Sequence, residues 1–170
     1  MTSKEYFKKL RLIYFVFLTS IIPILGIATF YNDLLMLELD GSTALILSIV
    51  LVLIGSSTVV IGFLIFKVIT SKITKESSIG QKLAAYQHAF LIRSALIEGI
   101  ALLSAATYAI TSFEIALIIS ALLFAVLFVL KPSPKKLKKV FDFSPTEIAR
   151  IDSGTDQIVT KKDLSGKLTA

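Results

Sequence analysis

Glu98 is the residue of this chain most able to do chemistry, because it is an acid in the middle of the apolar run from Tyr86 to Ile110. At ~1.5 Å per residue it lies about 15 Å beyond His88, which is half of a ~30 Å hydrocarbon core. An unpaired charge at the centre of a bilayer costs ~2.5 to 3.5 kcal/mol on insertion scales, so an acid there is a functional-site hypothesis by default. Helical spacing places it on one small and polar stripe, formed by Gln87, Ser94, Glu98, Ala101, Ala105 and Tyr108. We expect Glu98 to point into a helix bundle, to be neutral there and to hydrogen-bond a hydroxyl group.

The hydroxyl partner of Glu98 is predicted to come from the preceding apolar segment, which has Ser56 and Ser57 at its centre. Together with Ser94 and Glu98, these serines make up a possible proton or cation site. The close-packing face of the same segment is predicted at three small residues spaced seven apart, Ser48, Gly55 and Gly62. Two interpretations of Glu98 remain open: a polar clamp that joins two helices, or a carrier of a proton or cation.

Two further polar residues, Arg93 and His88, lie in the same run as possible interface anchors. Arg93 is five residues from Glu98, about 140° around a helix, so the two side chains do not pair directly. Its guanidinium is predicted to reach the cytoplasmic headgroups, with an interhelical contact as the alternative. His88 is predicted to be a boundary residue. A lone histidine in a chain without cysteine makes no metal site, and no cofactor is expected.

Catalytic motifs are not found in the sequence. No nucleophile with its base and no nucleotide fingerprint stands out, and Gly80-Gln81-Lys82 lacks the upstream glycine of a phosphate-binding loop. Enzyme activity is therefore not expected. The net charge of +6 has an explanation other than nucleic acid, which is the placement of the basic residues along the chain, so no nucleic-acid partner is expected either.

Four apolar segments position these residues: 10–30, 43–66, 85–110 and 113–130. The chain is 55% hydrophobic, with a mean hydropathy of +0.82, and each segment has about the ~17 to 25 residues that a spanning helix needs. The predicted fold is an all-α membrane protein with four transmembrane helices in an antiparallel bundle. Residues 1–9 would be a cytoplasmic N-terminus and residues 10–130 the transmembrane domain, with a kink at Pro23.

The orientation follows from the 18 lysines and arginines. They fall before or at the start of the first segment, between the second and third or early in the third, and after the fourth, whereas the connections 31–42 and 111–112 have none. The positive-inside rule then places both termini and the middle loop in the cytoplasm, in a bacterial inner membrane. Lys72, Lys75 and Lys82 of that loop are expected to face lipid headgroups.

The tail is divided into a basic juxtamembrane segment with a short helix, residues 131–152, and a flexible end, residues 153–170. Lys135, Lys136, Lys138 and Lys139 are either a simple stop-transfer anchor or contacts to anionic lipids, each worth ~1 kcal/mol near the surface. Ser144, Pro145 and Glu147 match the start of a helix, with serine as the cap and glutamate as the third helical residue.

Residues 94–102, with the sequence SALIEGIAL, resemble the ion-carrying helix of rotary ATPase c subunits. The resemblance implies that Glu98 binds and releases a transported ion. As a whole the chain is similar to small four-span bacterial inner-membrane proteins with a basic, proline-containing tail, a likeness that carries no activity. The predicted function is a non-enzymatic structural or accessory component of a membrane complex, in contact with the bilayer and with a second copy or a partner protein. The alternative is a proton- or cation-translocating subunit, or a small transporter, that uses Glu98.

Overall fold

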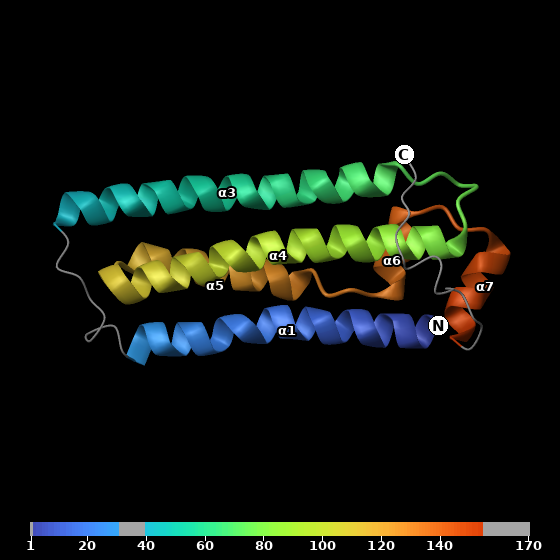
Figure 1. The fold of residues 1–170 in the computed structure, drawn as a ribbon, viewed down its shortest axis with the longest axis horizontal. Coiled ribbons are helices and arrows are strands. Elements are labelled where there is room, and N and C mark those ends of the chain that lie inside the picture. The colour runs from blue at the N-terminus through green and yellow to red at the C-terminus, as the bar shows by residue number, and fades with distance from the viewer. Residues whose placement is uncertain (1, 31–39, 155–170) are drawn as a thin grey trace. The chain divides into compact units, whose positions relative to one another are not determined.

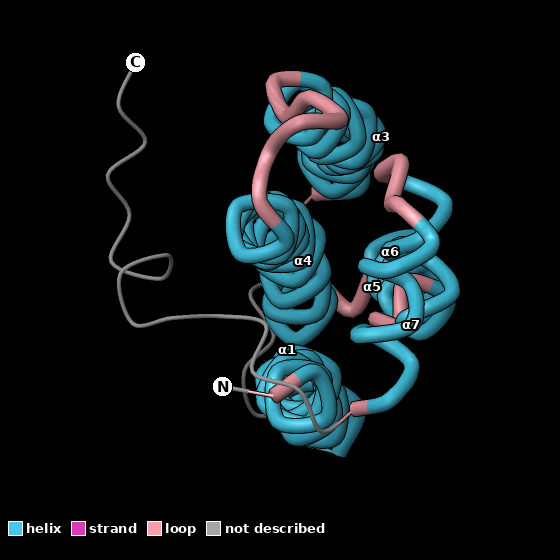
Figure 2. Tube along the Cα trace, turned by 90° about the vertical axis from the view of Figure 1, so that its right-hand side faces the viewer, coloured by secondary structure: helices cyan, strands magenta, loops and turns pink. Residues whose placement is uncertain are grey.

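The computed structural model describes residues 2–30 and 40–154, and the described chain is entirely helical and loop (Figures 1 and 2). The helices are α1 (Ser3–Phe30), α3 (Gly41–Ser71), α4 (Ile79–Thr111), α5 (Glu114–Val129), α6 (Pro134–Val140) and α7 (Pro145–Ser153). The predicted all-α class is confirmed. The flexible end predicted from residue 153 lies, from residue 155 onward, outside the described residues.

Three helices, α1, α3 and α4, are long and apolar enough to cross a membrane. α5 has 16 residues and is too short to meet the same criterion alone. It meets the criterion only together with α6, to which it is bent by 86°. At ~1.5 Å per residue α5 is about 24 Å long, less than a ~30 Å hydrocarbon core, so the predicted fourth span at 113–130 is shorter than expected. Its ends explain the difference. Ser112 has a positive φ of 53°, and Pro134 begins the next helix after the turn at Leu130.

The chain divides into two compact units, and α1, α3 and α4 contribute residues to both. The first consists of residues 1–14, 64–92 and 131–170, and we call it the charged unit because it contains every lysine and arginine except Arg93. The second consists of residues 15–63 and 93–130, and we call it the apolar unit.

The charged unit has large side chains in its interior. Tyr6, Tyr86, Phe90 and Leu137 are each no more than 2% exposed. The Tyr6 hydroxyl donates to the Leu83 carbonyl at 2.8 Å, joining α1 to α4. Bulky apolar and aromatic residues inside, with charges outside, are typical of packing against water.

The apolar unit has the opposite arrangement. Many of its interior positions are small, with Ser94, Ala101, Ala105, Ala116 and Ser120 all at 0% exposure, beside the larger buried side chains of Ile21 and Ile97. Its outside is made of large apolar side chains: of the large hydrophobic residues that the structure leaves exposed, all but Leu12, Leu64 and Val68 belong to this unit. Small residues between helices and apolar residues outside are the arrangement of helices packed in lipid.

The predicted small face of the second segment is confirmed in the apolar unit. Ser48 is 2% exposed, a Cβ added at Gly55 would lie 3.4 Å from Ile100, and one at Gly62 would lie 3.3 Å from Arg93. These contacts run in opposite directions along α3 and α4, so the two helices are antiparallel. α5 is joined to α4 by the Ser120 hydroxyl, which donates to the Ala101 carbonyl at 2.9 Å.

Candidate functional site

Glu98 is half-buried on α4, in the apolar unit, and its carboxyl oxygen Oε1 hydrogen-bonds the hydroxyl of Ser20 on α1. Ser94, one helical turn before it, and Ala101, just under one turn after it, are both fully buried. This part of the predicted inward stripe is therefore confirmed. The stripe exists because α4 has small residues at the spacing of one helical face, which lets α1, α3 and α5 approach closely.

The partner of Glu98 differs from the one predicted. Ser56 and Ser57 are both exposed, and Ser56 donates to the Leu53 carbonyl of its own helix at 3.1 Å. Gly55 takes the position against α4, and at about 100° per residue the next two residues turn away from it. Ser20 was not identified from the sequence. Its place in the middle of the segment 10–30, the depth that Glu98 has in its own segment, is the signal that points to it.

The Ser20 hydroxyl lies between two oxygen atoms. It contacts the Phe17 carbonyl at 2.8 Å and the Glu98 carboxyl group. A hydroxyl has one hydrogen to donate and two lone pairs that accept. If Glu98 is protonated and donates to Ser20, Ser20 donates in turn to Phe17 and each contact becomes a hydrogen bond. If Glu98 is ionised, the single hydrogen of Ser20 serves only one of the two oxygens well.

Arg93 is 7% exposed and lies against α3, with its guanidinium carbon 5.2 Å from the centre of the Phe63 ring. Its Cγ is also the atom nearest to a Cβ built on Gly62. This contact corresponds to the interhelical alternative for Arg93. A guanidinium over an aromatic ring is favourable by ~0.5 to 2 kcal/mol, more when water is excluded. His88 is exposed on α4, in the charged unit, and its role as a boundary residue stays a prediction.

Lys82 forms a second polar cluster, in the charged unit, that the sequence did not reveal. Its side chain is 1% exposed, so the prediction that it faces headgroups is wrong. The ammonium group donates to both carboxylate oxygens of Glu147, at 3.1 and 3.2 Å, and to the Asp142 carbonyl at 3.1 Å. It also lies 5.0 Å from the centre of the Phe143 ring. Lys82 therefore fastens the segment that contains α7 to the start of α4.

Glu147 has a local role as well as this distant one. The predicted helix start is confirmed: the Ser144 side chain accepts from the Glu147 amide, and the Glu147 carboxylate accepts from the Ser144 amide at 2.8 Å. Burial raises the pKa of Glu147, but the Ser144 amide and the Lys82 ammonium outweigh it, so the pKa lies below the ordinary glutamate value. The carboxylate is thus stabilised as the anion that Lys82 requires.

The basic tail is helical in its first part. α6 begins at Pro134, after the Ser133 cap, and buries Leu137 completely. Lys138 pairs with Asp152 of α7 at 2.6 Å, whereas Lys135, Lys136 and Lys139 have exposed side chains. Contact of these lysines with anionic lipids stays a prediction.

In the part of the chain that the structure describes, no group of three or more histidine, cysteine, aspartate or glutamate side chains is placed to hold a metal ion. No protein-family model, curated protein or solved structure matches the chain.

Proposed function

We propose that this chain is an integral protein of the bacterial inner membrane, whose apolar unit crosses the bilayer four times and whose charged unit lies at the cytoplasmic face. The observation that carries the proposal is the outer surface of the apolar unit, which has nearly all of the large hydrophobic side chains that the structure leaves exposed, around an interior with many small residues. Apolar side chains on the outside of a helical unit are stable when lipid surrounds them. Both termini are then cytoplasmic, in an antiparallel bundle.

The distribution of charge supports the same orientation. The apolar unit contains a single basic residue, Arg93, while the charged unit contains all the others. Basic residues remain on the cytoplasmic side during insertion, so the charged unit belongs there. The fourth crossing would use α5, whose ~24 Å length requires local thinning of the bilayer at a modest cost.

The role proposed for the protein is that of a non-enzymatic structural or accessory component. Three polar contacts among the described residues join different helices: Ser20 with Glu98, Ser120 with the Ala101 carbonyl, and Lys82 with Glu147. Glu98 is proposed to be a neutral clamp between α1 and α4. The contact between the Ser20 hydroxyl and the Glu98 carboxyl group, which joins the two helices, supports this proposal.

The orientation is tested by labelling single cysteines in whole cells, and the chain has no native cysteine to interfere. Asn32→Cys, in the connection before α3, should react with a membrane-impermeant thiol reagent. Ser153→Cys, at the end of α7, should react only after the cells are permeabilised. The two variants control each other for expression and labelling chemistry. Labelling of Ser153→Cys alone in intact cells would invert the proposed topology.

A further inference from the structure

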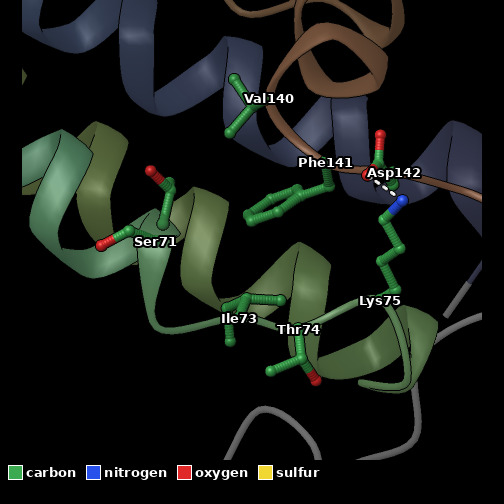
Figure 3. A pocket seen from close by; sticks show the side chains of 8 residues that line it. Ser71, Ile73, Thr74, Lys75, Val140, Phe141 and Asp142 are labelled. Carbon is green, nitrogen blue, oxygen red and sulfur yellow. Dashed lines mark ion pairs between the residues drawn. The ribbon is translucent and has the colours of Figure 1, made fainter.

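The charged unit contains a cavity of about 210 Å³ between the end of α3 and the residues that follow α6. Its polar lining comes from Thr70, Ser71, Thr74, Lys75 and Asp142, and the ring of Phe141 supplies an apolar wall. Figure 3 shows this ring between Ser71 and the Lys75–Asp142 ion pair. The question is which kind of ligand these groups suit.

Two of the three hydroxyl groups that line the cavity offer lone pairs and not hydrogens. Thr70 donates its hydrogen to the Phe66 carbonyl at 2.8 Å, and Ser71 donates to the Val68 carbonyl at 3.0 Å. α3 ends at Ser71 and has no basic side chain in its last turn, so the helix end adds a partial negative charge at the cavity. Asp142 adds a carboxylate. All of these groups favour a positive ligand and disfavour a phosphate.

The structure already places one ammonium group at this cavity. Lys75 Nζ lies 3.1 Å from the Asp142 carboxylate. The two side chains are 81% and 72% exposed, and an ion pair so open to water contributes little and is easily exchanged. Asp142 is held in place independently of this pair, because its backbone carbonyl binds the buried Lys82.

We propose that this cavity binds an organic ammonium group, with Asp142 as its counter-ion, the Phe141 ring as its apolar wall, and Lys75 as the side chain that the ligand displaces. A primary amine of small size fits the chemistry, and it has two sources: the amine headgroup of a lipid or a soluble amine. The amine site depends neither on the orientation of the chain in the membrane nor on the role of Glu98, so it can be tested independently of the proposed function.

The test uses the full chain in detergent micelles, with ethanolamine as the probe and ligand-observed NMR as the measurement. The wild type should bind ethanolamine saturably. Asp142→Asn should weaken binding by up to about fivefold, the effect of losing an ion pair to an exposed carboxylate. Asp152→Asn is the matched control, because Asp152 is also an exposed aspartate paired with a lysine but does not line the cavity. It should leave binding unchanged.

The sign of the Lys75 effect separates this proposal from an anion site. Lys75→Ala removes the competing ammonium group and should strengthen ethanolamine binding, whereas it would weaken the binding of inorganic phosphate. Hydrogen exchange at the α7 amides should be unchanged in both Asp142→Asn and Lys75→Ala, which shows that the segment is still docked. Absence of saturable ethanolamine binding in Lys75→Ala, or weaker binding than in the wild type, overturns the proposal.

A second arm distinguishes the sources of the amine. Phosphatidylethanolamine added to the micelles should displace ethanolamine if the natural ligand is a lipid headgroup, and phosphatidylglycerol should not. If neither lipid competes while ethanolamine still binds, the cavity takes a soluble amine. Equal displacement by both lipids would contradict recognition of an ammonium group.

Discussion

Ser20 has one hydroxyl hydrogen and two oxygen atoms within reach, the Phe17 carbonyl and the carboxyl group of Glu98. The Ser20 hydroxyl donates toward both oxygens, and the amide oxygen of a glutamine at position 98 can accept in the same way as the carboxyl oxygen. We therefore predict that Glu98→Gln leaves the stability of the protein in micelles almost unchanged, while Glu98→Ala loses about 0.6 kcal/mol, the average of interhelical hydrogen bonds in membranes.

The measurement is a double-mutant cycle with Ser20→Ala, read by unfolding in mixed micelles. The coupling free energy between Glu98→Ala and Ser20→Ala should equal most of the unfolding free energy that each single variant loses. Infrared difference spectra of the wild type against Glu98→Gln should contain the band of a protonated carboxyl group. Cation flux in proteoliposomes gives the opposing result: a flux present in the wild type and lost in Glu98→Gln would show that the clamp is not a sufficient account.

Lys82 and Glu147 form an ion pair whose two members differ in exposure, 1% for Lys82 and 21% for Glu147. Glu147→Gln leaves the buried ammonium without a compensating charge, while glutamine still suits the capping box. Lys82→Met leaves a carboxylate that water and the Ser144 amide still reach. We predict that Glu147→Gln destabilises the docking of α7 by about 3 to 5 kcal/mol and Lys82→Met by only about 1.5 to 3 kcal/mol.

Hydrogen exchange at the amides of α7 measures this docking. The double variant, Lys82→Met with Glu147→Gln, should be more protected than Glu147→Gln alone, because no unpaired charge stays buried. Acid provides a further control. Because the pKa of Glu147 is lowered, the ionised carboxylate stabilises the docking of α7 at any pH above the ordinary glutamate range. This stabilisation is lost as the pH falls through the lowered pKa. Greater damage from Lys82→Met than from Glu147→Gln would contradict the assignment of Lys82 as the buried member.

At the scale of elements, α6 presents its lysines unequally. Leu137 is completely buried, which fixes the rotation of the helix, and Lys138 is engaged with Asp152. Lys135 and Lys139, one turn apart, are exposed. We predict that Lys135→Gln lowers the affinity of the protein for fluorescent phosphatidylglycerol about fivefold, which corresponds to ~1 kcal/mol per basic residue. Lys138→Gln, the matched control, should change it less than twofold.

The comparison is made in micelles at low and high salt. Screening should remove the effect of Lys135→Gln, because surface attraction falls off within a Debye length. Equal effects of Lys135→Gln and Lys138→Gln would mean that the Lys138–Asp152 pair does not persist in the membrane.

Local features of the elements could be predicted from the sequence, and distant pairings could not. The capping box at Ser144 was predicted because all its atoms lie within four residues. The helices are longer than the predicted apolar segments: α4 begins at Ile79 and not at residue 85, and α3 continues to Ser71 and not only to residue 66. Hydropathy detects only the apolar part of a helix and not the polar turns that extend it. The Ser20–Glu98 and Lys82–Glu147 contacts join residues 78 and 65 positions apart, which no periodicity encodes.

At the scale of the whole molecule, the boundary between the two units falls inside single helices. α4 belongs to the charged unit up to Ile92 and to the apolar unit from Arg93. The apolar unit exposes so many apolar side chains that the protein would aggregate if this surface faced water. The boundary along α4 should therefore be the place where the surroundings of the helix change from water to lipid.

Spin labels on α4 test this boundary, with the protein reconstituted in lipid vesicles. His88→Cys and Leu103→Cys both replace exposed side chains, one in each unit, about 22 Å apart along the helix. We predict that the label at position 103 collides mainly with oxygen, which concentrates in lipid, and the label at position 88 mainly with a water-soluble nickel chelate. Ile97→Cys, at a position with 0% exposure, is the control for a label shielded from both. If the nickel chelate reaches position 103 as readily as position 88, the apolar unit is not surrounded by hydrocarbon, and the four crossings proposed for this chain are wrong.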